Sequence, residues 1–454
     1  MSNSVNAGAR LDRLPISSFH RRVMMLIGIG MFFDGFDIYI AATVLGSTLH
    51  SGFSTLAQNA LFVSSTFVGM MLGSFMTGFL GDRLGRRFTY QFNLLLFGGA
   101  SILAAFAPNM TVLILLRLVM GIGLGAENVV GYSTLTEFAP ARVRGKWLGG
   151  MAVFVVSGLP VAALIGTYVI PAFTWRAMFI LGGVGGLVVW YLRKSLPESP
   201  RWLESVGRTE EAEALLQKIE AESAGGKPLP APAPPAAVAP SRSLSSLWSP
   251  ALLPRMFVGC VALIVINTLL YGFITWLPTF FVKQGLTIAT SFQYSMLMSI
   301  GAPVGAAIGA LTADRWGRKP TITISALLAI AFGFIYPFVS DPVMLPVIGF
   351  ALTVPIYVLV ALLFAIYIPE LFPTEVRLRA SGICNTFGRG ATVVTPFLVV
   401  WLFSNFGIRG VLSLMIGLLI ALVAVVLVFG VESGKRSLEQ MEEDRLLAVR
   451  LRKA

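Results

Sequence analysis

The sequence predicts an all-α membrane protein of about twelve transmembrane helices, arranged as two related bundles of six. Three observations support this fold: an apolar composition, a succession of long apolar segments, and two motifs that occur once in each half. The 454 residues are 56% hydrophobic and 12% charged, with a mean hydropathy of +0.80. A soluble domain contains far more charge than this.

A membrane-spanning helix needs about 20 predominantly apolar residues, and segments of that length follow one another along the chain. The first apolar segment is longer than the apolar region of a signal peptide and lacks a small-residue cleavage site, which predicts a true span. The expected spans are 22–49, 58–80, 88–107, 110–136, 146–169, 174–194, 253–282, 291–312, 320–339, 342–367, 378–404 and 408–432.

These spans divide the chain into five parts. We expect an N-terminal tail (1–21), a six-helix bundle (22–194), a linker (195–252), a second bundle (253–432) and a C-terminal tail (433–454). Within the linker, 209–222 has a charged helical pattern, and 227–240 is rich in Pro and Ala, which favours a flexible or extended segment. The tail alternates charge and Leu at helical spacing, which predicts a helix near the anionic membrane surface.

The net charge of +12 comes from basic residues in the loops between apolar segments. This distribution predicts topology and argues against nucleic-acid binding. Four arginines precede the first span, whereas the predicted outer loops carry only Arg176, Lys283 and Arg409. The positive-inside bias therefore places both termini in the cytoplasm of a bacterial-type inner membrane.

The sequence contains no pattern typical of an enzyme, a metal site or a cofactor site. Cys260 and Cys384 lie in apolar segments, where small buried side chains are the ordinary interpretation. His20 and His50 lie at the ends of spans and are expected at the surface.

Two motifs return in the second half at the same spacing of about 232 residues. Asp82-Arg83-Leu84-Gly85-Arg86-Arg87 follows the second span, and Asp314-Arg315-Trp316-Gly317-Arg318-Lys319 follows the eighth. Glu137-x-x-Pro140-x-x-Val143-Arg144 follows the fourth span, and Glu370-x-x-Pro373-x-x-Val376-Arg377 follows the tenth. Two motifs with one offset predict a duplicated structure, and paired bundles are typical of alternating-access carriers.

Each of these inner loops combines an acid, a glycine turn and arginines, which suits a charged latch between helix ends that holds one state closed. The alternative is that the arginines only fix topology. The predicted gate residues are Asp82, Arg83, Arg86, Glu137, Arg144, Asp314, Arg315, Arg318, Glu370 and Arg377.

The segment Gly81–Arg87 resembles the loop motif of the major facilitator superfamily. Pro197–Leu203, followed by Gly207-Arg208, resembles the inner-loop motif of its sugar-porter branch, and Glu432–Lys435 is similar to a degraded form of that branch's C-terminal motif. The resemblance implies the major facilitator fold and secondary active transport. The seventh span lacks the Gln pair and further amides usual in sugar porters, which argues against sugar as substrate.

A closer resemblance is to the aromatic acid/proton symporters and the nicotinate-type carriers. It rests on Asp34-Gly35-Phe36-Asp37, Gly125-Ala126-Glu127, Trp276-Leu277-Pro278, and Gly388-Arg389-Gly390 followed by Pro396. Together these elements imply a carrier of small organic acids.

Ionisable residues within the membrane are costly and are functional candidates by default. Asp34 and Asp37 lie near one face of the first span, where two buried carboxylates do not ionise together easily, so one is expected to carry a proton. Arg117 lies at a depth compatible with Asp37, and the resemblance to proton-coupled sugar porters implies that they form a coupling pair. We expect protonation of Asp37 to release Arg117; the alternative is a permanent salt bridge that only joins two helices.

Glu127 and Arg389 lie near the midplane of their spans, one in each half. The guanidinium of Arg389 suits a carboxylate, so Arg389 is the expected ligand of a substrate anion. Glu127 is expected to balance Arg389 when the site is empty and to accept a second proton during transport. A resting ion pair between the two, without a ligand role, is the alternative.

Aromatic and amide side chains near these charges are expected to contact the substrate. For each aromatic residue taken singly, ordinary packing is the alternative, and for each amide a bond between helices. The predicted substrate-binding set, besides Arg389, is Phe36, Tyr39, Asn267, Tyr271, Trp276, Tyr357 and Asn385.

The leading hypothesis is a monomeric, proton-coupled symporter that imports a small carboxylate, aromatic or otherwise. Its expected partners are the carboxylate, protons and membrane lipid, without nucleic acid, metal or other cofactor. The alternatives are an antiporter that exports a drug or metabolite, a sugar or polyol symporter, and a membrane sensor that does not transport.

Overall fold

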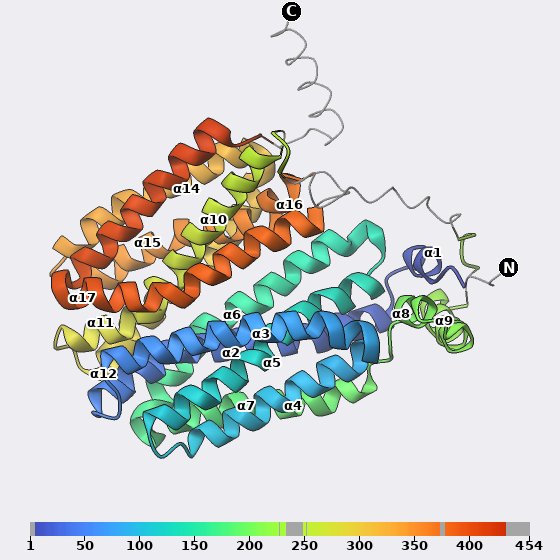
Figure 1. Cartoon of the computed structure of the whole chain (residues 1–454), viewed down its shortest axis with the longest axis horizontal. Helices are drawn as coiled ribbons and strands as arrows, with labels where there is room; N and C mark the ends of the chain where they lie inside the picture. The colour runs from blue at the N-terminus through green and yellow to red at the C-terminus, as the bar shows by residue number, and fades with distance from the viewer. Residues whose placement is uncertain (1–4, 227, 233–247, 251, 373–376, 433–454) are drawn as a thin grey trace, which may run out of the picture. The chain divides into compact units, whose positions relative to one another are not determined.

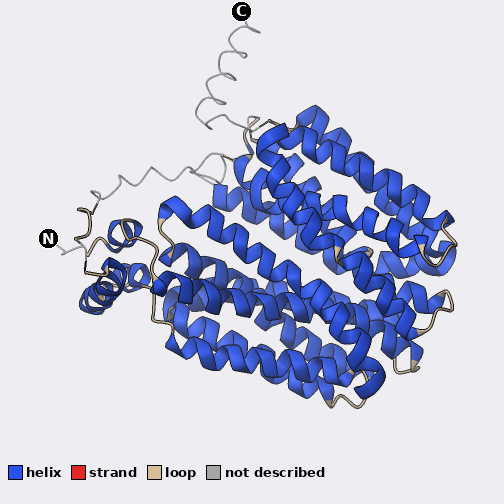
Figure 2. Cartoon of the chain, turned by 180° about the vertical axis from the view of Figure 1, so that it is seen from behind, coloured by secondary structure: helices blue, strands red, loops and turns tan. Residues whose placement is uncertain are grey.

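A computed structural model describes residues 5–226, 228–232, 248–250, 252–372 and 377–432, and every regular element within these ranges is helical (Figure 2). The chain forms two compact units, Met1–Val238 and Ala239–Ala454. Within the described ranges, ten helical segments are long and apolar enough to cross a membrane. The prediction of an all-α membrane protein is confirmed.

The N-terminal unit contains six long helices, with short helices before and after them (Figure 1). Side-chain caps fix two of the starts, because Thr55 accepts a hydrogen bond from the amide of Gln58 and Asn109 accepts one from the amide of Val112. The elements in chain order are α1 (Ala7–Asp12), α2 (Ser18–His50), α3 (Leu56–Leu84), α4 (Arg86–Ala105), α5 (Met110–Phe138), α6 (Ala141–Phe173), α7 (Arg176–Leu192), η1 (Arg193–Ser195), α8 (Pro200–Ser205) and α9 (Thr209–Ala224).

The C-terminal unit has the same order of spans, but several are interrupted. A break at Ile300 divides one span into α12 and α13, and Gly407, with φ of 63°, divides α17 into two. These interruptions explain why ten long segments correspond to about twelve crossings. The elements are α10 (Leu253–Gly272), η3 (Ile274–Trp276), α11 (Leu277–Lys283), α12 (Ile288–Ser299), α13 (Gly301–Trp316), α14 (Arg318–Ile335), η4 (Tyr336–Phe338), α15 (Met344–Val360), η5 (Ala361–Tyr367), α16 (Ile368–Glu370) and α17 (Arg377–Phe429).

The helices of the two units pair in the same way. In the N-terminal unit α3 packs on α5, α2 on α6, and α4 on both α5 and α7. The corresponding pairs in the C-terminal unit are α13 with α15, α10 with α17, and α14 with both α15 and α17. The second unit therefore repeats the packing of the first, as the duplicated motifs predict.

Glycines allow the central pair of each unit to approach closely. A Cβ atom on Gly73 of α3 would lie 1.9 Å from the carbonyl oxygen of Ile122 on α5. A Cβ atom on Gly305 of α13 would lie 2.2 Å from the carbonyl oxygen of Val354 on α15. Only glycine fits at either place, and the contact in the N-terminal unit sets the position of the α5 side chains that face α3.

Helices α1, α8 and α9 gather at one end of the N-terminal unit, beside the start of α2 (Figure 1). Leu11 of α1 and Leu14, two residues after its end, are fully buried there. His20, expected at the surface, is buried as well, and its ring packs edge-on against Phe19 with centroids 5.4 Å apart. That prediction was wrong because α2 begins beneath other helices; His50 is exposed as expected.

Candidate functional site

Asp37 of α2 and Arg117 of α5 form an ion pair in the interior of the N-terminal unit. Nη1 of Arg117 lies 2.5 Å from Oδ2 of Asp37, and Nη2 donates to the backbone carbonyl of Asp37 at 2.9 Å. Nε donates to the hydroxyl of Thr66 on α3 at 3.0 Å, and the guanidinium lies 5.0 Å from the Phe62 ring centroid. Both charged side chains are at most 1% exposed, so each depends on the other for compensation of its charge.

Glu127 of α5 forms a second buried ion pair, with Arg193 of η1. Arg193 also donates from Nε to the carbonyl of Leu26 and from Nη2 to that of Ile27, each at 3.0 Å. The missing side chain of Gly30 makes this possible, because a Cβ atom there would lie 1.9 Å from Nη2. The arginine is thus held by both α2 and α5.

Arg193 is a residue of this site that its sequence context did not predict. Its position directly after the apolar end of α7 made it one more basic residue at a membrane boundary. A long arginine side chain at a helix end can also reach back along its helix. Gly30 on α2 and an acid within the apolar span of α5, Glu127, were the only signals for that alternative.

Asp34 is the third acid in this interior. It is 1% exposed, and neither of its carboxylate oxygens has a hydrogen-bond partner among the described residues. It interacts electrostatically with Glu127, Arg193 and Asp37. The structure therefore gathers Asp34, Asp37 and Glu127 in one unit, together with two arginines.

Three predicted substrate-binding residues of the C-terminal unit lie where α10 meets α17. Arg389 forms a side-chain hydrogen bond with the hydroxyl of Tyr271. Asn267, one helical turn before Tyr271, donates to the carbonyl of Leu263 at 2.7 Å. Gly388 lets the two helices approach, since a Cβ atom there would lie 2.8 Å from Nδ2 of Asn267. This contact presents an arginine, a phenol and an amide together.

The other predicted residues of this unit are spread along it. Trp276 is buried and stacks on Phe280 with ring centroids 6.3 Å apart. Tyr357 is buried within α15. Asn385 is exposed, and its amide donates to the carbonyl of Ser381 in its own helix at 2.9 Å.

Phe36 and Tyr39 are the predicted substrate-binding residues of the N-terminal unit. Both are buried in α2, on either side of Asp37. Phe36 packs edge-on against Phe33 with ring centroids 6.3 Å apart. The Phe36 ring and the Asp37 carboxylate both face Gly182 of α7, where an added Cβ atom would lie 3.9 Å and 3.7 Å from them.

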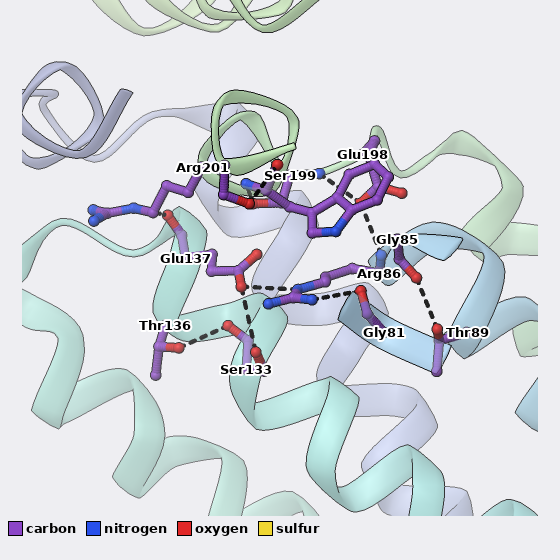
Figure 3. Close-up of polar contacts among 12 residues, drawn as sticks. Gly81, Gly85, Arg86, Thr89, Ser133, Thr136, Glu137, Glu198, Ser199 and Arg201 are labelled. Atoms are coloured by element: carbon purple, nitrogen blue, oxygen red, sulfur yellow. Dashed lines mark hydrogen bonds and ion pairs between the residues drawn. The ribbon is translucent and has the colours of Figure 1, made fainter. Parts of the chain in front are cut away.

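The first loop motif forms a charged cluster at one end of the N-terminal unit (Figure 3). Gly85, with φ of 92°, turns the chain from α3 into α4. Glu198 then caps α4 by accepting from the amide of Arg86 at 3.0 Å and from that of Arg87 at 3.1 Å. The Arg86 side chain lies 2.9 Å from Glu137 at the end of α5. The cluster joins the end of α3, the start of α4 and the end of α5 to the loop that carries Glu198.

The C-terminal unit repeats this cluster. Gly317 has φ of 93°, and Glu432 accepts from the amides of Arg318 at 2.8 Å and Lys319 at 2.9 Å. Nε of Arg318 lies 3.0 Å from Oε2 of Glu370. Glu198 and Glu432, from the two motifs that resemble the sugar-porter pattern, thus have equivalent partners, which sequence reasoning did not assign.

The remaining predicted gate residues contribute less to these clusters. Arg83 and Arg315 are exposed. The side chains of Asp82, Arg144, Asp314 and Arg377 lie outside the part that the structure describes, as do most of the Pro/Ala-rich linker and the C-terminal tail. Among the described residues, no group of three or more His, Cys, Asp or Glu side chains is placed to hold a metal ion.

Comparison with known proteins gives consistent matches along most of the chain. The family model described as sugar (and other) transporter matches residues 23–444. The inner membrane metabolite transport protein YdjE of Escherichia coli strain K12 is 38% identical over 445 residues, which are 96% of this chain and 98% of that protein. The niacin transporter NiaP of Acinetobacter baylyi is 32% identical over 441 residues, with 95% and 99% covered.

Solved structures share the fold at lower identity. The crystal structure of a D-xylose-proton symporter matches with a TM-score of 0.73 at 16% identity, and covers 93% of this chain and 100% of that one. A partially occluded, inward-open xylose transporter XylE from E. coli matches with a TM-score of 0.72 at 17% identity, with the same coverage. At these identities the likeness concerns the fold alone.

Proposed function

The chain belongs to the sugar (and other) transporter family of the major facilitator superfamily, and on this premise we propose that it imports a small organic acid together with protons. It is an integral membrane transporter of small molecules and not an enzyme. The substrate is an aromatic or other monocarboxylate, the coupling ion is the proton, and transport is directed inward by alternating access.

The buried pair of Asp37 and Arg117 is the observation that carries this proposal. Both charges are removed from water, so neutralising one of them leaves the other without compensation. A proton on Asp37 would weaken its bond to Arg117, and α2 and α5 would then be free to adopt a second arrangement. Protonation and conformation are coupled in this way.

Arg389 supports the choice of an anion as substrate. Its guanidinium suits a carboxylate, and its described partner Tyr271 is a neutral phenol. An anion entering a cell is opposed by about 2.3 kcal/mol per 100 mV of inside-negative potential, which accompanying protons reverse. The 32% identical relative is a transporter of niacin, a small aromatic acid.

We place both termini, and therefore both charged clusters, on the cytoplasmic side of the inner membrane, as the excess of basic residues in the corresponding loops suggests. Each cluster would hold the helix ends of its own unit together in the state that is closed to the cytoplasm. Since each unit has its own interior and the two are copies, one chain suffices for transport.

Uptake by purified protein in proteoliposomes tests the proposal. The assay compares nicotinate, benzoate, acetate, xylose and arabinose, each with an inward acid gradient, without a gradient, and with a protonophore. We expect accumulation of at least one carboxylate only with the gradient. Asp37→Asn should abolish accumulation but retain exchange of labelled for unlabelled substrate, whereas Asp341→Asn, a change in an exposed loop, should retain both.

Other outcomes identify the alternatives. Accumulation of a sugar but of no acid would support a sugar symporter. Alkalinisation of the vesicle lumen by proton efflux on substrate entry would indicate antiport. Uptake that is indifferent to the pH gradient would contradict proton coupling altogether.

A further inference from the structure

Three acids are buried among the described residues of the N-terminal unit, and two of them are compensated by an arginine. If all three are ionised, one negative charge remains uncompensated. Arg117 is committed to Asp37, and Arg193 to Glu127 and to two carbonyls of α2. Asp34 receives no hydrogen bond from either arginine or from any other described residue, although it is 1% exposed. A carboxylate in such a place is more stable with a proton.

We propose that Asp34, Glu127 and Arg193 form a second proton-binding site, separate from Asp37 and Arg117, in which Arg193 neutralises Glu127 and Asp34 carries the proton. This inference rests on the proposed proton-coupled function and deepens it. Oε2 of Glu127 and Oδ1 of Asp37 also lack a hydrogen-bond partner among the described residues, and we assign Oε2 of Glu127 as the acceptor for the proton on Asp34 because Glu127 is the acid that interacts most strongly with it.

The groups around Asp34 agree with this assignment. Helix α5 contributes Glu127 and Tyr132, η1 contributes Arg193, and α2 itself contributes Asp37. Helix α6 packs on the next residue, Gly35, through the backbone of Val155, which is uncharged. Among these described groups Arg193 is therefore the single cation. Arg117, the other buried arginine, is bonded to Asp37.

Arg193 acts here as a positioning residue. It joins a carboxylate on α5 to two carbonyls of α2, so its bonds hold the two helices that also carry Asp37 and Arg117. If Asp34 loses its proton, its new charge attracts Arg193, and the bond of Arg193 to Glu127 would weaken. A site of this kind adds one proton to the transport cycle, so that a monocarboxylate would enter with two protons and a net positive charge.

Infrared difference spectroscopy tests the site without requiring transport. The full-length chain in lipid nanodiscs is titrated from neutral to alkaline pH, and the carbonyl stretch of a protonated carboxylic acid is followed. We expect the wild type to show this band at neutral pH, and labelling with ¹³C-aspartate should shift it. The Asp34→Asn variant should lose the band, and Asp37→Asn should keep it.

The Arg193→Met variant provides an independent test by the same spectroscopy, because it removes the charge that keeps Glu127 ionised. A second band, insensitive to ¹³C-aspartate and absent from the Arg193→Met/Glu127→Gln double variant, is the expected result. A wild-type spectrum without a protonated carboxyl band at neutral pH, or a band that labelled aspartate does not shift, would overturn the site even if the variants fail to fold. If the band is present but carboxylate uptake is indifferent to pH, the site stands and the proposed symport fails.

Discussion

The two units of this transporter share their framework but differ in their buried charges. Both have a glycine contact between their central helices, and both have a cluster in which a glutamate caps one helix and an arginine bridges to another. Among the described residues, however, the ion pairs with both partners at most 1% exposed lie in the N-terminal unit. The C-terminal unit instead offers Arg389, half-buried beside a tyrosine.

This difference indicates which features the fold requires and which the function requires. Features present in both units are those that any helix pair of this architecture needs, namely close packing and capped ends. A fully buried ion pair is expensive wherever it occurs, so the presence of both such described pairs in one unit needs a reason beyond structure. In the proposed mechanism the N-terminal unit handles protons and the C-terminal unit binds the anion.

The largest expected effect comes from removing one arginine from each unit. Arg117→Met leaves Asp37 buried without its cation, which should cost about 3–5 kcal/mol of stability. Arg389→Met removes a half-buried guanidinium, which should cost less than about 1 kcal/mol of stability while abolishing carboxylate binding. Thermal unfolding of the purified variants, with and without nicotinate, measures both quantities.

The Asp37→Asn/Arg117→Met double variant is the matched control for this prediction. It removes both members of the buried pair, so it should recover much of the stability that Arg117→Met loses. An equal loss of stability from both single arginine substitutions would contradict the contrast between the units.

Substituting the contact glycine should destabilise the protein equally in either unit, because both contacts belong to the shared framework. Gly73→Ala and Gly305→Ala each force a methyl group against a backbone carbonyl of the neighbouring helix, which should cost about 1–3 kcal/mol. Gly99→Ala and Gly417→Ala serve as controls, since nothing lies within 4 Å of the added atom. Unfolding of the four variants in one detergent gives the comparison, and a tolerated Gly305→Ala would mean that the C-terminal contact is looser than its copy.

Replacing the capping glutamate should also cost the same stability in either unit, and this cost should be smaller than that of the glycine substitutions. Glu198→Gln and Glu432→Gln each remove a negative charge from a helix N-terminus, and should cost about 1 kcal/mol. Hydrogen exchange of the amides of Arg86 and Arg318, which donate to these glutamates, should accelerate about fivefold. Faster exchange at one amide only would show that the two clusters are not equivalent.

Most of the framework could be predicted from the sequence, because spans, loops and duplicated motifs depend on local composition and on spacing. The apposition of Asp37 and Arg117 followed from helix geometry and the family resemblance. The partner of Glu127 did not, because Arg193 reaches Glu127 only through a gap left by Gly30 on a third segment. Contacts of this kind depend on how side chains fold back along a helix, which no sequence pattern records.

His20 illustrates the same limit on the prediction of burial. A histidine at the start of a membrane span is ordinarily near water, so its position in the chain predicted exposure. It is buried where its ring packs against Trp147 of α6, with centroids 6.3 Å apart, and bonds Ser17, which in turn bonds Ser223 of α9 at 3.0 Å. The packing of α6 and the docking of α9 at the start of α2 overrode the local rule.

The docking of α1 on α9 gives the smallest expected effect on stability, and this effect is confined to the N-terminal unit. The side chain of Arg10 on α1 hydrogen-bonds Glu220 on α9 and, together with Arg13, lowers the pKa of that glutamate. A lowered pKa in the folded state means that the pair stabilises the docked helix fully above the ordinary glutamate pKa of about 4.3. The contribution, about 1 kcal/mol or less, is lost as the pH falls through the lowered value.

Hydrogen exchange of the α1 amides between pH 7 and pH 3, corrected for the intrinsic exchange rate, measures this loss. We expect α1 to lose protection on acidification, whereas the Glu220→Gln variant should show weaker docking at pH 7 and a flatter pH dependence. Glu211→Gln is the control, because the described ion-pair partner of Glu211 is its exposed neighbour Arg208. If α1 stays equally protected at pH 3, the buried Leu11 and Leu14 rather than Arg10 and Arg13 hold it in place.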